Sequence, residues 1–337
     1  MELGSESTEM ESNLMVKKNQ KLEAFDILRK ALIISARNIN FFIFTILTSL
    51  PLFFFLVYYE IFLQNFLVEI FEIVKQSPGY DYCYIIWPTG SLNVDITRKL
   101  NKEFLDELIQ LCLLYLVPLH LLELSTVLVI VDLASKIYTE EGPMMSLREM
   151  VNKPFDKARL KGTFITSVYV LFLSTCILLG LISLVTTYFV VLRNFGCDVF
   201  FAALCLPAFV GLLALYLAFS AVWNMSLVIS MLDGVHGTGA LALAIYYSRG
   251  SEWRGLRLML VFFAWGEGLR LPCLYFGCYE REYGIVAQIS LFCLGNVLKW
   301  VVCMVYFYDC KNRAFEKKEC VESADDEVGT QVETVEE

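Results

Sequence analysis

Five ionisable side chains fall inside long apolar runs of this sequence: His120, Glu123, Glu267, Arg270 and Lys299. Charge inside a bilayer is costly, so such side chains usually have a partner or a function. His120 and Glu123 are three residues apart, as are Glu267 and Arg270, which places each pair on one helix face. The helical rise from the cytoplasmic ends of the runs puts Glu123, Glu267 and Lys299 about 12–14 Å deep. His120 and Arg270 are then about one turn further out.

This intramembrane polar cluster has two interpretations. In the first, its charges compensate one another and clamp the helices together. In the second, they form a polar site within the bundle that binds a lipid head group, an ion or protons. Residue spacing alone leaves both interpretations open.

Signals for enzymatic chemistry are weak. His120-x-x-Glu123 is not a zinc-protease motif, and the chain holds only 2 histidines. It has no glycine-rich nucleotide loop, no GxSxG elbow and no CxxC pair. We therefore predict no catalytic residue, no cofactor and no metal site. The net charge of −9 argues against nucleic-acid binding, which needs a basic face.

Four cysteines carry separate hypotheses. Cys83, Cys197 and Cys278 each fall on a different loop predicted to face outside, where thiols tend to pair. Cys83 lies in the longest loop and can reach either partner. Because Tyr80 to Trp87 is aromatic and expected to fold onto the rim of the bundle, we rank a disulfide with Cys278 first and one with Cys197 second. Cys310 directly follows the last apolar run, a plausible acylation position. The alternative for Cys310 is an ordinary buried thiol.

The apolar runs themselves are long enough to cross a membrane. About 20 apolar residues at 1.5 Å per residue match a hydrocarbon core of about 30 Å. Charged residues make up 19% of the chain, compared with about 25% in soluble proteins. We predict an all-α, polytopic integral membrane protein with one membrane domain, residues 22–313. Its six spans are expected at about 41–59, 108–131, 163–192, 199–222, 258–277 and 285–308.

Basic residues set the predicted orientation. With the N-terminus in the cytoplasm, six spans place 19 of the 27 Lys and Arg residues in cytoplasmic segments and 6 on the other side. A seven-span alternative, in which residues 199–232 cross twice, removes this bias. We therefore expect six spans with both termini in the cytoplasm. The fourth helix is expected to emerge from the membrane and to break near Gly234 and Gly237.

Three segments lie before the first span or after the last one. Residues 1–21 are polar and expected to be disordered. Residues 22–37 are amphipathic, with Phe25 and Leu32 in the apolar stripe. They form either a helix in the membrane interface or a cytosolic extension of the first span. Residues 314–337 are acidic and expected to form a disordered tail.

One stretch resembles a known family. Trp223 to Gly237 and the following Ala240 to Arg249 are similar to a segment of a plant family of uncharacterised six-span transmembrane proteins. In that family a long fourth span leads to an acidic-Gly corner and then to a short helix ending in Ser and a basic residue. Those places are occupied here by Asp233, Gly237, Ser248 and Arg249.

The resemblance covers most of residues 22–313. The family is distantly similar to the membrane domain of some bacterial glycerophosphodiesterases, but this sequence has no catalytic domain of that kind. The resemblance implies a six-helix fold and a plant setting, in the endomembrane system (the ER) or the plasma membrane. It implies no activity.

These observations favour a non-enzymatic membrane component, which acts as a scaffold, an interaction partner or an organiser of lipids. Its expected partners are the lipid bilayer and other membrane proteins or a second copy of the chain. The alternative is a small transporter or channel that uses the polar cluster. A lipid-modifying enzyme is the third class.

Overall fold

The computed structural model describes residues 23–76, 102–139, 157–195, 199–275 and 282–333. Within these ranges every regular element is a helix, which confirms the predicted all-α class. The elements are α2 (Ala24–Arg37), α3 (Ile39–Gln76), α6 (Lys102–Leu114), the π-helical turn η1 (Tyr115–Leu119), α7 (His120–Thr139), α9 (Lys157–Phe195), α10 (Val199–Leu232), α11 (Thr238–Ser248), α12 (Glu252–Tyr275) and α13 (Glu282–Glu333).

Five segments are long and apolar enough to cross a membrane. They are Ile39–Phe66, Ile109–Thr139, Arg159–Leu184, Cys205–Leu232 and Tyr283–Glu316. This length and composition are those of a multi-pass membrane protein. The fifth predicted span, 258–277, coincides with most of α12, which is not among the five. Charged residues such as Glu267 and Arg270 lower the apolar character of α12.

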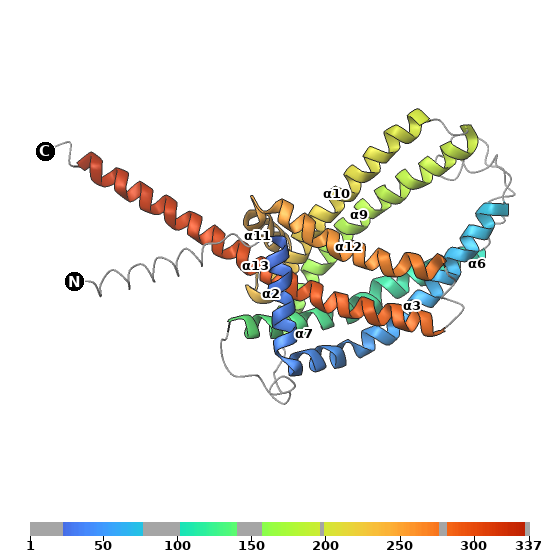
Figure 1. The fold of residues 1–337 in the computed structure, drawn as a ribbon, viewed down its shortest axis with the longest axis horizontal. Coiled ribbons are helices and arrows are strands. Elements are labelled where there is room, and N and C mark those ends of the chain that lie inside the picture. Colours follow the sequence, from blue (N-terminus) through green and yellow to red (C-terminus); the bar gives the residue numbers. More distant parts are fainter. Residues whose placement is uncertain (1–22, 77–101, 140–156, 196–198, 276–281, 334–337) are drawn as a thin grey trace.

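The long helices alternate in direction between two ends of one bundle (Figure 1). The end of the bundle where α2 and α11 lie is named the α11 end. α3 runs from the α11 end to the opposite end, and the continuous helix α6–η1–α7 runs back. α9 and α12 repeat the outward direction, and α10 and α13 repeat the return. Each returning helix therefore finishes at the α11 end, as a bundle of antiparallel crossings requires.

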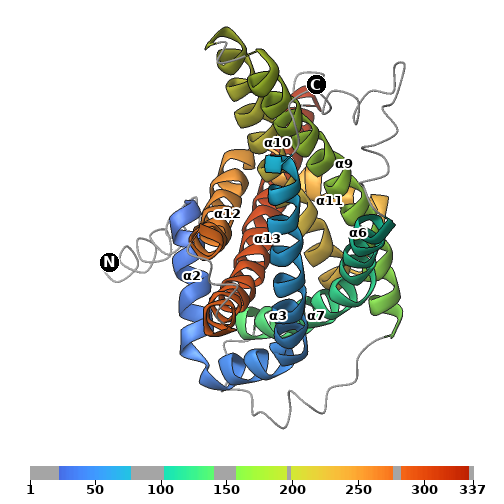
Figure 2. The ribbon, with the colours of Figure 1, turned by 90° about the vertical axis from the view of Figure 1, so that its right-hand side faces the viewer.

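α13 is the central helix of the bundle (Figure 2). It contacts α2, α3, α7, α10, α11 and α12. Its residues Val301, Val302, Met304, Val305 and Phe307 have no exposed surface. Apolar burial of this kind is what holds the α11 end of the bundle together.

The helix α6–η1–α7 contains one turn of π-helix, Tyr115–Leu119, around Pro118. Proline has no backbone N–H, and its ring clashes with the carbonyl four residues earlier, so the regular α-helical ladder is interrupted there. A π-helical turn accommodates the interruption within a continuous helix. The turn ends where His120 and the first residues of α7 begin.

The predicted break after the fourth span is confirmed. α10 ends at Leu232, and Gly234 and Gly237 have φ values of +71° and +63°, which favour glycine. The backbone N–H of Gly237 donates to Thr166 Oγ1 of α9 at 2.8 Å. This bond fixes the corner between α10 and α11 against α9.

α2 forms the predicted helix, but its apolar residues divide between two faces. Ile27 and Ala31 are fully buried against the bundle, while Phe25 and Leu32 of the predicted stripe are 74% and 48% exposed. α2 lies across the bundle helices rather than along them (Figure 1). It is therefore a separate helix packed on the bundle and not a straight extension of α3.

The prediction of a disordered tail from residue 314 is contradicted, because α13 continues as a helix through Glu333. Residues 314–333 contain no proline and several Ala, Glu and Lys residues, which have high helix propensity. High charge disfavours a packed core, but it does not prevent a helix that continues from a buried one. Residues 1–21 and 334–337 lie outside the described residues.

A candidate ligand cavity between the helices

A cavity of about 380 Å³ lies between η1, α7, α9, α10, α12 and α13. Four of the five predicted cluster residues line it: His120, Glu123, Glu267 and Lys299. They come from three helices that are distant in sequence, and the bundle brings them to one space. The structure therefore places four of the five predicted residues around one cavity.

α7 contributes His120 and Glu123 from its first turn. Because they are three residues apart on one helix, both side chains reach the same side of α7. His120 Nε2 lies 3.2 Å from Ser167 Oγ of α9, a hydrogen-bond distance. Ser167 Oγ in turn donates to the carbonyl of Phe164 at 2.8 Å. His120 thus connects the α7 and α9 walls of the cavity.

The other charged groups of the cavity are not paired with one another. Within the described residues, Glu123 and Glu267 form neither a hydrogen bond nor an ion pair, although both side chains are half-buried. Lys299 Nζ lies 4.8 Å from the centroid of the Trp300 ring, which is a cation–π contact. No carboxylate lies within ion-pair distance of Lys299 in the described part of the chain.

This arrangement differs from the expected clamp. A clamp would join Lys299 to Glu123 or Glu267, because those charges lie at similar predicted depths. The structure instead leaves two carboxylates and one ammonium group around a cavity. That geometry is typical of a polar site, since uncompensated charge in an apolar bundle needs a ligand or water as its partner.

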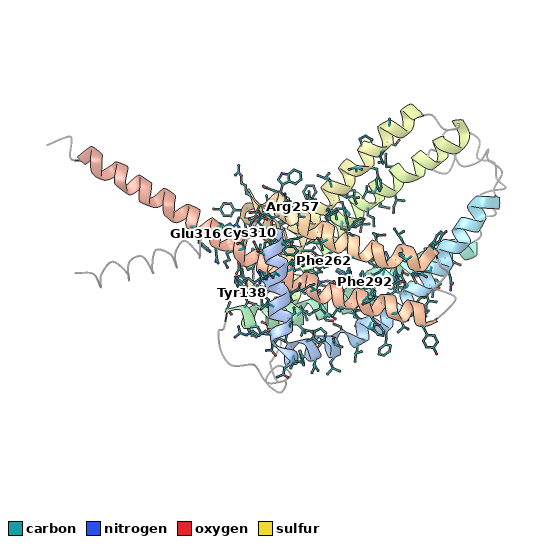
Figure 3. All side chains as sticks on the ribbon, viewed as in Figure 1. Tyr138, Arg257, Phe262, Phe292, Cys310 and Glu316 are labelled. Carbon is teal, nitrogen blue, oxygen red and sulfur yellow. The ribbon has the colours of Figure 1, made fainter. Side chains whose placement is uncertain are left out.

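Neutral polar groups and aromatic rings complete the wall. Asn224 Nδ2 donates to Ser220 Oγ at 3.4 Å and contacts Met259 Sδ at 3.3 Å. Trp300 is only 3% exposed, and its indole Nε1 has no hydrogen-bond partner in the described structure. Aromatic residues of the lining are Tyr115, Tyr216, Trp223, Phe262, Phe263, Trp265, Phe292 and Trp300. Figure 3 labels Phe262 on α12 and Phe292 on α13.

Arg270, the fifth predicted cluster residue, does not line the cavity. Its Nε and Nη2 donate to the two carboxylate oxygens of Glu60, each at 3.1 Å. Glu60 is 2% exposed. Gln64 and Gln288 also donate to Glu60 Oε1, at 3.1 and 3.4 Å. Arg270 is therefore separate from the four cavity residues, because it forms an ion pair with Glu60 of α3.

Glu60 is the residue that the sequence interpretation missed. The first span was ended at Tyr59, which placed Glu60 in an outer loop. The helix continues through Gln76, and its apolar segment extends to Phe66. Two signals were available: the apolar run continues after Glu60, and an arginine inside a span requires a counter-charge.

The structure also bears on the cysteine hypotheses. Cys310 has no exposed surface and belongs to the main core, at the place labelled in Figure 3. Burial favours the alternative of an ordinary buried thiol, because an acyl chain on Cys310 would require repacking of the core. The predicted disulfides of Cys83 with Cys278 or Cys197 involve residues that lie outside the described part of the chain.

Comparison with known proteins adds no assignment. No family model matches the chain, and no curated protein or solved structure shows significant similarity to it.

Proposed function

We propose that this protein is a non-enzymatic, multi-pass membrane protein that binds a lipid head group in the cavity. The observation that carries the proposal is the group of charged residues Glu123, Glu267 and Lys299, which line a cavity between apolar helices without a charged partner among the described residues. Leaving charge unpaired at this depth costs free energy. A bound polar group recovers part of that cost.

The surroundings of the cavity favour a ligand with apolar chains. Towards the end opposite α11, α9 and α10 lean away from α12 and α13 (Figures 1 and 2). Apolar side chains of these helices are exposed there, including Leu206 at 67%, Val210 at 54% and Leu271 at 60%. Acyl chains would cover these side chains while the head group occupies the cavity.

The proposal includes the membrane topology. α12 is the sixth crossing, and both termini are in the cytoplasm. The alternating direction of the long helices and the 19-to-6 distribution of basic residues support this arrangement. The ER or the plasma membrane of a plant is the proposed location, following the resemblance of residues 223–249. Other membrane proteins or a second copy are the proposed protein partners.

Filling the cavity tests the proposal. Ser174 of α9 lines the cavity, and the adjacent Thr175 is exposed and does not. We expect wild-type protein, purified in detergent, to retain phospholipid that mass spectrometry detects after delipidation. Ser174→Trp should lose most of this lipid because the indole occupies the space, whereas the matched control Thr175→Trp should retain it. Equal lipid retention by all three proteins would contradict the proposal.

Transport of a small solute is the second candidate function. The observation in its favour is that Glu267 and Lys299 meet the cavity within the apolar part of the bundle, where a solute or proton would cross. Flux into proteoliposomes tests it. Transport by the wild type that is lost in Glu267→Gln would favour this candidate over static lipid binding, and absence of flux with both proteins would favour lipid binding.

A further inference from the structure

The charged and aromatic groups of the cavity specify more than a lipid in general. Two carboxylates, Glu123 and Glu267, line it from α7 and α12, and eight aromatic residues share the wall. Carboxylates together with aromatic faces are the recognition elements for organic ammonium ions, because the ring faces and the carboxylates both attract positive charge. A metal cation would instead need several close oxygen ligands. No group of three or more metal-ligating side chains occurs among the described residues.

A separate part of the wall offers donors to an anion. Lys299 of α13 lines the cavity with its half-buried ammonium group. Asn296 of the same helix also lines the cavity. The ammonium group of Lys299 and the side-chain amide of Asn296 are suited to a phosphate oxygen.

We propose that the cavity binds a zwitterionic group, with its organic ammonium between Glu123 and Glu267 and its phosphate at Lys299. The inference rests on the proposed function and specifies its ligand class. The same chemistry is present in the head group of a choline or ethanolamine phospholipid and in free phosphocholine. The exposed apolar side chains beside the cavity favour the lipid as the source.

The experiment uses the full chain in detergent with three soluble probes, and tryptophan fluorescence reports binding. The probes are dihexanoyl-phosphatidylcholine, dihexanoyl-phosphatidylglycerol and free phosphocholine. Trp223, Trp265 and Trp300 line the cavity and provide the signal. We expect the phosphatidylcholine probe to bind at least about tenfold more tightly than the phosphatidylglycerol probe, which has a phosphate but no ammonium group.

Charge-neutralising variants separate the two ends of the ligand. Glu123→Gln and Glu267→Gln should each weaken phosphatidylcholine binding by about tenfold and leave phosphatidylglycerol binding unchanged. Lys299→Gln should weaken the binding of both lipid probes. Glu316→Gln is the matched control, because Glu316 is exposed on α13 and does not line the cavity. Each variant is compared only after its thermal unfolding in detergent is shown to match the wild type.

The outcomes distinguish this inference from the proposed function. If both lipids bind equally and the glutamate variants change neither affinity, the inference of a zwitterionic ligand is wrong. The proposed binding of a lipid would still stand. Binding of neither lipid would overturn both. If free phosphocholine binds as tightly as the lipid, the inference of a zwitterionic ligand stands, but the ligand is a soluble molecule and not a lipid.

Discussion

The side chains that the sequence singles out divide into a paired group and an unpaired group. Arg270 makes a two-point ion pair with the buried Glu60. Glu123, Glu267 and Lys299 face a cavity without such partners in the described residues. One charged group of the bundle is thus stabilised by an ion pair, whereas the others lack one among the described residues. Mutations of the two groups should therefore differ in their effect on stability.

Replacing Arg270 by leucine should destabilise the protein, because it leaves the Glu60 carboxylate buried without its cation. The expected loss lies between about 1 kcal/mol, typical of polar interactions in membranes, and about 3 kcal/mol, the low end for a fully buried ion pair, because the Arg270 side chain is 43% exposed. Thermal unfolding in detergent measures it. The double variant Glu60→Gln/Arg270→Leu should recover part of the loss. An Arg270→Leu protein as stable as the wild type would show that the pair has no structural role.

Replacing Lys299 by leucine should destabilise the protein less than replacing Arg270. The described contact of Lys299 is with the Trp300 ring, and such contacts contribute about 0.5–2 kcal/mol. Leucine also removes a half-buried charge, which offsets part of that loss. The same unfolding assay provides the comparison with Arg270→Leu. A larger loss for Lys299→Leu than for Arg270→Leu would favour the clamp interpretation of the cluster.

At the scale of helices, close packing between α10, α12 and α13 fixes the α11 end of the cavity. A Cβ atom at Gly255 of α12 would lie 2.9 Å from the Ala221 Cβ of α10 and 2.9 Å from the Tyr306 hydroxyl of α13. The Tyr306 hydroxyl itself donates to the carbonyl of Ser251 at 3.1 Å. Gly255 is therefore required by the approach of two helices and not by backbone conformation.

Gly255→Ala should consequently destabilise the protein by about 1–3 kcal/mol, the usual cost of overpacking. Gly268→Ala on the same helix is the matched control, because its Cβ would have no neighbour within 4 Å among the described residues. Alanine has the higher helix propensity, so this variant should be neutral or slightly stabilising. Thermal unfolding of both variants checks the prediction. Equal behaviour of the two would mean that α10 and α12 are not in close contact at Gly255.

The helices were largely predictable from the sequence, and the limits of that prediction have identifiable causes. Apolar runs located the long helices, and the Gly234 and Gly237 pair located the break after α10. Glu60 was not recognised as the partner of Arg270 because the first span was expected to end at Tyr59, which left Glu60 in the outer loop. The division of the polar cluster was missed because residue depth along a helix does not specify which neighbour a side chain faces. That direction depends on tertiary packing.

Over the whole molecule, the alternating helices and the basic residues predict one topology. We expect reporter tags at both termini to be located in the cytoplasm. Lys299 and Arg270 aside, most Lys and Arg residues would then lie on the side of the α11 end. A C-terminal tag on the opposite side would contradict the six-crossing arrangement, and it would require α12 to remain on one side of the membrane.

The central claim is that the cavity between α7, α9, α10, α12 and α13 holds a lipid head group. The most direct test is a cryo-electron microscopy map of the protein in phosphatidylcholine nanodiscs, with a bound antibody fragment as a fiducial. We predict non-protein density in the cavity, in contact with Glu123, Glu267 and Lys299 and continuous with acyl-chain density beside α10 and α12. A cavity closed by side chains, with Lys299 paired to Glu123 or Glu267 and no density between them, would contradict the claim.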